Sequence, residues 1–361
     1  MLPTISAGTL FLACCASGSG DATIAPQNDI AAPRADNLHL PDGFVAYRYA
    51  QGFEEPTAIE LAPDGMLWLS ERGGRIIALP DTNDDLVAEP RTFAENFDLQ
   101  ELLGIAVDED DVVYASSRGR ISVITDDDGD GDADSIDDIV TDLPNGRHQN
   151  NNIVLGRDER LYFGNGSTCN LCDDESEMSG AILSVKPNGD DLRVFATGLR
   201  NPYGIIFSAD GNLYVTDNGP DPPDIQGAPD ELNRIVEGDD YGWPDCIGGQ
   251  ELEAGACEES TPPLALLQQR SSSDGLATYD AEDFPEEYRH AAFIAQWGPT
   301  SEDIDAGRRV VYVQVREEVP QERVFATGFD RPIDVAADLE GRLYVADFAT
   351  GIVYVIVYEG A

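Results

Sequence analysis

A repeated pattern of short β-rich segments constrains the fold of this 361-residue chain more than any other feature. Each copy consists of an Asp- or Gly-type turn, a short apolar strand, a polar turn and a second strand. Six copies are present, and their first strands begin at Leu67, Val113, Leu161, Leu213, Phe293 and Leu343. These starts are separated by 46, 48, 52, 80 and 50 residues, so the fourth interval contains a large insertion.

Further apolar stretches lie between the copies, at 57–61, 104–107, 204–207 and 334–337, so each unit contains about four strands. Four-stranded units of this length, repeated in a closed ring, are typical of a β-propeller. We therefore predict an all-β, six-bladed β-propeller of four-stranded antiparallel blades over residues 39–361. A solenoid is the alternative fold, but the sequence shows no capping repeats, and ring closure removes exposed strand edges.

Residues 1–38 are predicted to contain an export signal and an Ala- and Pro-rich linker. The apolar run 9–13 ends at Cys14, an order typical of a signal whose cysteine accepts a lipid anchor, although no Lys or Arg precedes the run. The run is too short to span a bilayer as a mature helix. We therefore expect an exported protein, periplasmic or extracellular, with Cys14 as the candidate lipid-anchor site.

Four further cysteines allow three disulfide pairings. Cys169 and Cys172 form a CxxC motif, and Cys246 and Cys257 lie close together downstream. Pairing within each set is the simplest arrangement. Zinc binding is the alternative for the CxxC motif, but the second pair is more widely spaced and no histidine lies nearby. Disulfides are favoured, and they agree with an exported protein.

The charge balance is strongly acidic, with 69 Asp and Glu residues against 22 Lys and Arg residues and a net charge of -47. Such a chain is not expected to bind nucleic acid. Self-repulsion weakens a compact fold unless salt or bound cations screen it. The composition indicates a salt-rich habitat or calcium bound by some carboxylates; a solvated acidic surface is the alternative explanation.

Residues 126–137 form a candidate calcium loop. When they are aligned with the twelve-residue EF-type loop, oxygen-bearing residues occupy positions 1, 3, 5, 7, 9 and 12, and Gly131 occupies the required sixth position. The loop departs from the EF-type pattern by ending in Asp instead of Glu and by joining strands instead of helices. The spacing nevertheless predicts a calcium site, which we expect to be structural. An ordinary acidic turn is the alternative. The predicted ligands are Asp126, Asp128, Asp130, Asp132, Asp134 and Asp137.

Several polar segments depart from the strand pattern, and loops at equivalent places in successive blades gather at one end of the axial channel. Together they resemble the pyrroloquinoline quinone (PQQ)-dependent soluble aldose and sorbosone dehydrogenases, most closely the sorbosone-dehydrogenase-like branch. The resemblance covers most of residues 40–361 and implies a six-bladed propeller. The segments that carry it are 102–106, 146–152, 166–172, 198–204, 230–233, 241–246 and 328–332.

The resemblance implies oxidation of a small sugar or alcohol that depends on PQQ and Ca²⁺, with electrons passed to an external acceptor. His148 matches the family's catalytic base, which removes the hydroxyl proton. Arg200 and Asn201 match the pair that contacts the quinone, and Arg331 resembles an arginine that holds the cofactor carboxylates. Gln100 lies near a polar residue on the sugar side, one residue out of register.

The resemblance also implies metal ligands. Gly219 and Pro220 would supply main-chain oxygens to the cofactor calcium, and Asp230, Glu231 and Tyr241 resemble positions near a structural calcium. No lysine matches the family's cofactor-contacting lysine, because Lys186, the only lysine, lies in a turn.

Two other functions remain open at this point. One is a cofactor-free propeller that binds a ligand or protein with the same face. The other is a calcium-dependent lactone hydrolase, which would need several carboxylates converging on one axial metal.

Overall fold

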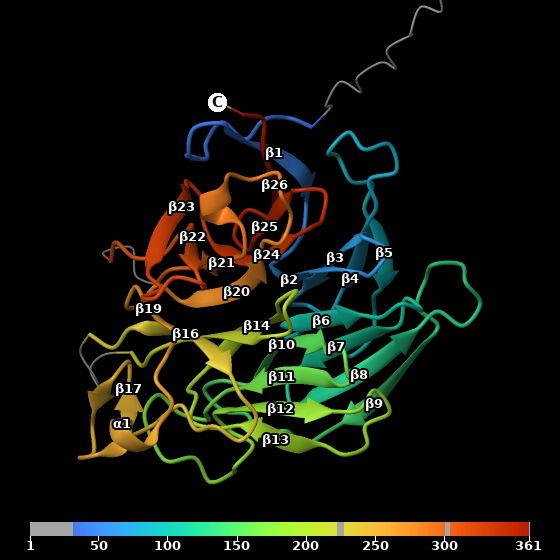
Figure 1. The fold of residues 1–361 in the computed structure, drawn as a ribbon. Helices are drawn as coiled ribbons and strands as arrows, with labels where there is room; N and C mark the ends of the chain where they lie inside the picture. The colour runs from blue at the N-terminus through green and yellow to red at the C-terminus, as the bar shows by residue number, and fades with distance from the viewer. Residues whose placement is uncertain (1–31, 222–226, 300–303, 361) are drawn as a thin grey trace, which may run out of the picture.

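A computed structural model describes residues 32–221, 227–299 and 304–360. Its strands form six four-stranded antiparallel sheets around a central axis (Figure 1), which confirms the predicted six-bladed propeller. The predicted export run and Cys14 lie outside the described residues. Within the described part, the model contains no helix that is both long and apolar enough to cross a membrane.

The blades follow one another along the chain, and each begins with its innermost strand. The first blade consists of β2 (Pro56–Leu61), β3 (Leu67–Glu71), β4 (Ile76–Leu79) and β5 (Arg91–Ala94). The second consists of β6 (Gly104–Val107), β7 (Val113–Ser117), β8 (Arg120–Thr125) and β9 (Ser135–Val140). The third consists of β10 (Asn150–Leu155), β11 (Leu161–Asn165), β12 (Ala181–Val185) and β13 (Arg193–Ala196). The fourth blade consists of β14 (Pro202–Phe207), β15 (Leu213–Asp217), β16 (Asp230–Ile235) and β19 (Ala265–Leu267). The fifth consists of β20 (Ser273–Thr278), β21 (Ala291–Gln296), β22 (Arg309–Gln314) and β23 (Glu322–Thr327). The sixth consists of β24 (Pro332–Ala337), β25 (Leu343–Asp347), β26 (Ile352–Tyr358) and β1 (Phe44–Gln51).

The sixth blade closes the ring with strands from both ends of the described chain. The N-terminal strand β1 is its outermost strand and pairs antiparallel with β26, with Phe44 opposite Tyr358. Figure 1 shows the two strands side by side. Because the ring closes, no blade leaves a lateral face uncovered by a neighbouring blade.

The predicted strand starts agree with the structure at Leu67, Val113, Leu161, Leu213 and Leu343. β21 begins two residues before the predicted Phe293, because Ala291 already pairs with Gln314 of β22. The long fourth interval contains the insertion that the spacing predicted. Its elements are β17 (Cys246–Ile247), β18 (Gln250–Glu251), the short helix α1 (Ala256–Glu259) and the 3₁₀ turn η1 (Glu286–Tyr288).

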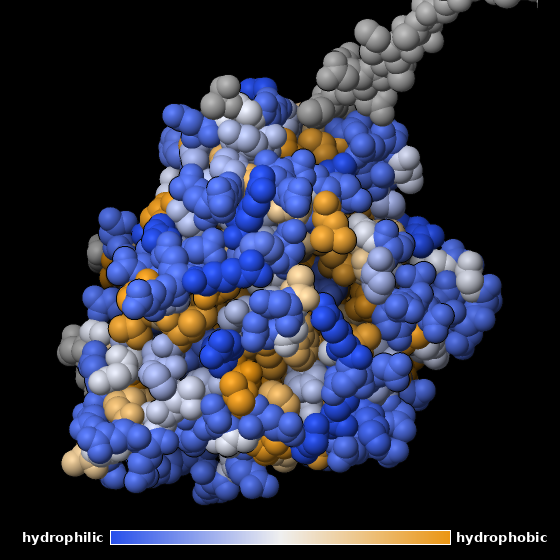
Figure 2. Space-filling view, viewed as in Figure 1, coloured by the Kyte–Doolittle hydropathy of each residue, from blue (hydrophilic) through white to orange (hydrophobic). Residues whose placement is uncertain are grey.

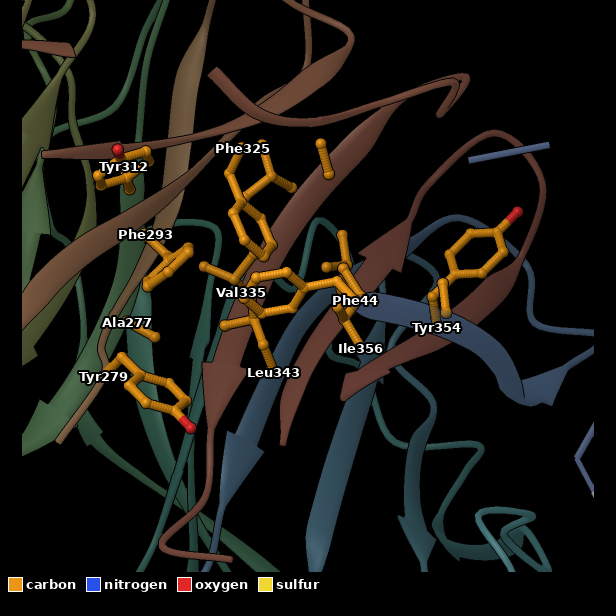
Figure 3. Packing of buried hydrophobic residues seen from close by; sticks show 14 of the residues in the cluster. Phe44, Ala277, Tyr279, Phe293, Tyr312, Phe325, Val335, Leu343, Tyr354 and Ile356 are labelled. Carbon is orange, nitrogen blue, oxygen red and sulfur yellow. The ribbon is translucent and has the colours of Figure 1, made fainter. Parts of the chain in front are cut away.

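Apolar side chains fill the spaces between blades, and the largest cluster joins the fifth and sixth (Figure 3). Phe44 of β1 lies in this cluster and meets Phe284 and Phe325 edge to face, with ring centroids 4.7 and 5.1 Å apart. Burying one such side chain contributes about 1.5–3 kcal/mol. The N-terminal strand is therefore held by packing as well as by its ladder.

The second strand of every blade ends in a buried polar residue: Glu71, Ser117, Asn165, Asp217, Gln296 and Asp347. In three blades this residue is a carboxylate that accepts hydrogen bonds from backbone N–H groups of the loop entering the blade. Hydrogen bonds to a charged acceptor are stronger than neutral ones. These strand ends therefore fix the loops that enter the blades.

Because neighbouring strands run in opposite directions, the connections separate onto two faces of the ring. Links from second to third strands, and from one blade to the next, lie on one face, which we call the site face. Links from first to second and from third to fourth strands begin on the opposite face. The segments carrying His148, Arg200 and Arg331 enter blades and so lie on the site face, whereas the acidic loop after β8 lies on the opposite one.

Candidate active site

A cavity of about 290 Å³ opens on the site face. Its lining includes the predicted residues His148, Arg200, Asn201 and Gly219. An adjoining hollow shares Trp297 with this cavity and contains Arg331. The structure therefore brings together the main residues that the sequence comparison assigned to one site. Figure 2 shows that hydrophilic side chains cover most of the visible surface of the protein and that a hollow lies near its centre.

His148 is held by the segment that follows β11. Its Nδ1 lies 2.8 Å from the carbonyl oxygen of Ser167. Because a carbonyl can only accept, Nδ1 carries the proton and Nε2 keeps a free lone pair. Gly166 permits this approach, since a Cβ there would lie 2.5 Å from the His148 Cβ.

The electrostatic surroundings keep His148 neutral. Burial, and next the charge of Arg200, lower the pKa of His148 to about 3, while the hydrogen bond to Ser167 acts in the opposite direction. A neutral imidazole can accept a proton from a hydroxyl group. The side chain therefore has the protonation state that a general base needs at neutral pH.

Arg200 is almost fully buried, with 3% of its surface exposed. Its Nε donates to the Asn170 carbonyl at 3.0 Å, its Nη2 to Asn170 Oδ1 at 2.7 Å, and its Nη1 to the Asn218 carbonyl at 2.8 Å. Its guanidinium also lies 5.9 Å from the Trp243 ring centroid. Each terminal nitrogen has a second N–H, so the group can still donate to a ligand.

Asn201 is oriented by its neighbours. Its side-chain oxygen accepts a hydrogen bond from Asn151 Nδ2 at 2.9 Å, which leaves its own amide group as a donor. Its backbone N–H, with that of Arg200, donates to the Asp217 carboxylate. Two neighbouring residues thus present donors to the cavity from a fixed backbone.

Arg331 is positioned by a different set of contacts. Its Nη1 donates to the Pro299 carbonyl at 2.7 Å and its guanidinium lies 4.2 Å from the centroid of the Trp297 ring. This distance is within the range of cation–π attraction. Trp297 and Arg331 together form a flat, cationic wall between the two hollows.

A small acidic cavity lies behind Arg200. It measures about 10 Å³, close to the space that one water-sized particle needs. Asp217, Gly219, Pro220, Glu231 and Tyr241 all line it, which brings together four of the predicted metal ligands.

The charges in this small cavity favour a cation. The pairing of β15 with β16 places Asp217 opposite Glu231. Burial, and next the charge of Glu231, raise the pKa of Asp217. The charge of Arg200 lowers the pKa of Asp217, but no ion pair between either carboxylate and an Arg or Lys is found in the described ranges. Asp217 accepts backbone N–H groups, and Glu231 accepts from Asn233 and Gly248, so a Ca²⁺ ion here would share these carboxylate oxygens with existing donors.

The acidic loop after β8 brings three predicted ligands together. The carboxylates of Asp126, Asp128 and Asp130 lie within 4.8 Å of one another. Asp134 Oδ2 accepts the N–H of Asp127 at 2.8 Å instead of joining this group. Asp132 and Asp137 are not part of it either.

This trio bears on the lactone hydrolase alternative. It is the one group of three His, Cys, Asp or Glu side chains with this spacing in the part of the chain that the structure describes. It lies on a loop after the third strand of its blade and not on the axis. No second group of three such side chains with this spacing lies on the axis within the described ranges.

Both predicted disulfides form as local pairs, Cys169 with Cys172 and Cys246 with Cys257. Gln100 is exposed and lines neither hollow, and its carbonyl accepts the N–H of Arg118.

The sequence did not single out Arg147 or Arg270, although both line the cavity beside His148. Arg147 is the residue directly before His148, and this adjacency was the one available signal for it. Arg270 comes from the connection between β19 and β20, where no motif indicated a site residue.

Comparisons with known proteins identify the family of this chain. The model of the family described as Glucose / Sorbosone dehydrogenase matches residues 53–354. Quinoprotein glucose dehydrogenase B of Acinetobacter calcoaceticus is 24% identical over 249 residues, covering 54% of this chain and 51% of its own length. A protein of Borreliella burgdorferi is 24% identical over 202 residues, covering 51% and 53%. The chain spans about half the length of these curated relatives.

Solved structures share the fold over nearly their whole length. The PQQ domain of pyranose dehydrogenase from Coprinopsis cinerea superposes with a TM-score of 0.74 at 18% identity, covering 89% of this chain and 97% of its own. The PQQ-bound aldose sugar dehydrogenase of Streptomyces coelicolor has a TM-score of 0.70 at 22% identity, covering 88% and 99%. The matched family model shows that this chain belongs to the glucose/sorbosone dehydrogenase family, a family of sugar-oxidising oxidoreductases.

Proposed function

We propose that the protein is a PQQ- and Ca²⁺-dependent dehydrogenase that oxidises an aldose- or sorbosone-like sugar or an alcohol and passes electrons to an external acceptor. Family membership supports sugar oxidation in general. The observation that carries the proposal is His148, neutral and held through Nδ1, in a cavity that it shares with Arg147, Arg200 and Arg270.

The residues around the cavity fit the cofactor. PQQ carries three carboxylates and an ortho-quinone, so its site needs fixed cations and hydrogen-bond donors. Arg147, Arg200, Arg270 and Arg331 surround the two hollows in a chain whose net charge is -47. Arg270 places a positive charge beside the cavity, in a chain that has no lysine to match the family's cofactor-contacting lysine. Arg200 and Asn201 would face the quinone, and when bound, PQQ supplies the hydride acceptor.

The chain's own residues would manage the proton. His148 Nε2 takes the hydroxyl proton of the substrate as its carbon is oxidised. The Ser167 carbonyl, which accepts from Nδ1, holds the ring in place and stabilises the positive charge that forms. Burial of the ring keeps Nε2 neutral beforehand, so the base is ready in the resting protein.

Calcium would be held at two kinds of site. Gly219 and Pro220 would offer carbonyl oxygens beside the cofactor, and Glu231 with Asp217 would offer carboxylates to an ion in the small cavity. The Tyr241 hydroxyl is engaged with Arg234 and Val236, so Tyr241 would contribute through its main-chain oxygen. The loop containing Asp126 would bind a structural calcium on the opposite face.

Export is the third part of the proposal. Two disulfides agree with an oxidising compartment, periplasmic or extracellular. A lipid anchor at Cys14 would keep the protein at a membrane surface.

Dye-linked oxidation of a panel of aldoses and alcohols by the purified protein tests the proposal, with and without PQQ and Ca²⁺, at low and high salt. His148→Ala is expected to lower kcat by about 10²- to 10⁴-fold. His290→Ala is the matched control, because His290 pairs with Asp280 away from the cavity. Absence of turnover and of PQQ binding at every salt concentration would favour the cofactor-free binding propeller.

A further inference from the structure

The Cys169–Cys172 disulfide closes a four-residue loop that contacts Arg200, a residue of the cavity lining. Ser167, two residues before this loop, accepts the hydrogen bond from His148 Nδ1. Inside the loop lies Asn170, which holds Arg200. One short segment therefore touches both the proposed base and the principal proposed cofactor-binding arginine.

Asn170 contacts Arg200 through two oxygens. Its main-chain carbonyl accepts from Nε and its side-chain oxygen accepts from Nη2. The same side chain donates to the Asp221 carbonyl at 3.0 Å and accepts from the Asp221 N–H at 3.1 Å. Asn170 thus fixes the direction of the guanidinium and joins it to the loop after β15.

The two disulfides differ in accessibility. Cys169 and Cys172 are both partly exposed, whereas in the other pair Cys257 is partly exposed and Cys246 is buried, with 7% of its surface exposed. A small dissolved thiol would therefore reach the Cys169–Cys172 bond more readily. Opening this bond frees the backbone of Asn170 while leaving the strand ladders of the blades in place.

We propose that the Cys169–Cys172 loop is a positioning element for Arg200, and that opening the disulfide weakens the grip of the site on a carboxylate-bearing quinone without unfolding the propeller. The second part rests on the proposed function. The first part concerns only the contacts between Asn170 and Arg200.

The chemical step is thiol–disulfide exchange with a dithiol. One thiolate attacks a cystine sulfur and forms a mixed disulfide, and the second thiol closes the ring of the reductant. Two electrons pass from the dithiol to the cystine. The products are a cyclic disulfide and two cysteine thiols at positions 169 and 172.

The positioning role is tested without any cofactor, by reaction of the full chain with phenylglyoxal and peptide mass spectrometry of the modified arginines. Arg200 is expected to react about tenfold faster after mild dithiol treatment, or in Cys169→Ser/Cys172→Ser, a factor that corresponds to one hydrogen bond to a charged group. Arg316, which is exposed far from the loop, is the internal standard. An unchanged Arg200 rate would overturn the proposal.

Asn170→Ala keeps the disulfide and removes one contact to Arg200, so it tests the same role if the double serine variant fails to fold. It is expected to raise the Arg200 rate as well. Asn212→Ala, in a turn between first and second strands, is the control. If the Arg200 rate rose in the double serine variant but not in Asn170→Ala, that result would contradict the role of Asn170.

The consequence for binding is measured as the Kd of PQQ for the apo protein, followed by tryptophan fluorescence. The double serine variant is expected to bind about tenfold more weakly. In an Arg200→Ala background the same substitutions should have no further effect, because the disulfide acts through Arg200. Equal losses in both backgrounds would contradict the proposal. Absence of PQQ binding in the unaltered protein would instead reject the proposed function, while the phenylglyoxal rates would still decide the positioning role.

Discussion

The loop that carries Arg200 in the fourth blade and the loop that carries Arg331 in the sixth are anchored in the same way. Asp217 at the end of β15 accepts the backbone N–H groups of Arg200 and Asn201. Asp347 at the end of β25 accepts those of Asp330 and Arg331. In each blade a buried carboxylate fixes the backbone beside an arginine.

The two anchors differ in what lies across the sheet. Asp217 faces Glu231, whereas Asp347 faces Ile352. Asp347 also accepts the N–H groups of Ala349 and Thr350, so its charge is compensated by four backbone donors. Anchoring an arginine loop therefore needs one carboxylate. The second carboxylate of the fourth blade, Glu231, accepts hydrogen bonds from Asn233 and Gly248, and under the proposed function it would also bind a cation.

Removing the charge of each anchor is the strongest test of this comparison. Asp347→Asn is expected to lower the free energy of unfolding by about 3 kcal/mol, because charged acceptors of several N–H groups are lost. Asp217→Asn should cost less in the absence of Ca²⁺, since it also relieves repulsion from Glu231. Chemical unfolding in chelator measures both. Equal losses would mean that Glu231 does not act on Asp217.

Removing each arginine in turn compares how much the two loops contribute to PQQ binding. Arg200→Ala is expected to weaken PQQ binding about 100-fold, since Arg200 is buried and held by three hydrogen bonds. Arg331→Ala should weaken it about tenfold, because Arg331 stacks on Trp297 at the side of the hollow. Titration of the apo proteins gives both constants. A larger loss in Arg331→Ala would reverse the assignment of the principal anchor.

Calcium removal sharpens the difference between the blades. At a Ca²⁺ concentration 100 times its Kd, the protein should gain about 2.7 kcal/mol of stability. In Glu231→Gln most of this gain should disappear, whereas Ile352→Val, at the matching position of the sixth blade, should retain it. Thermal unfolding with Ca²⁺ and with chelator is the measurement. A full calcium response in Glu231→Gln would place the ion elsewhere, with the loop containing Asp126 as the next candidate.

The pH profile gives the smallest expected effect. The pKa of His148 is lowered to about 3, so its neutral form persists down to that pH and kcat/KM should fall only in the acid range. Arg200 contributes to this lowering, so Arg200→Ala should move the acid limb to higher pH. Arg331→Ala should leave the limb in place. A limb that moves equally in both variants would contradict the separation of the two arginines.

The repeat predicted the blades well because its signal is local. Five of the six second strands begin at the predicted residue, since the turn and the following apolar run lie within one short segment. Closure by β1 was not predicted, because its partner β26 lies about 300 residues away and the sequence of β1 does not indicate that pairing.

The site was predicted only where a motif carried it. His148, Arg200 and Asn201 lie in motifs, and the structure brings them together. The contact of Asn170 with Arg200 joins segments 30 residues apart, and Asp217 meets Glu231 only through the register of β15 and β16. Such contacts depend on how loops from different blades fold over the axis, which no local pattern specifies.

The pairing of β1 with β26 also fixes the order in which a growing chain can finish folding. Among the described strands, β1 is synthesised before all others and pairs with β26, so the sixth sheet cannot form until β26 has left the ribosome. Until then β1 carries an unpaired edge, and Phe44 has no aromatic cluster to enter. Synthesis at 5–20 residues per second would keep that edge open for roughly 15–60 s. During this interval the unpaired edge of β1 is available for pairing with another chain.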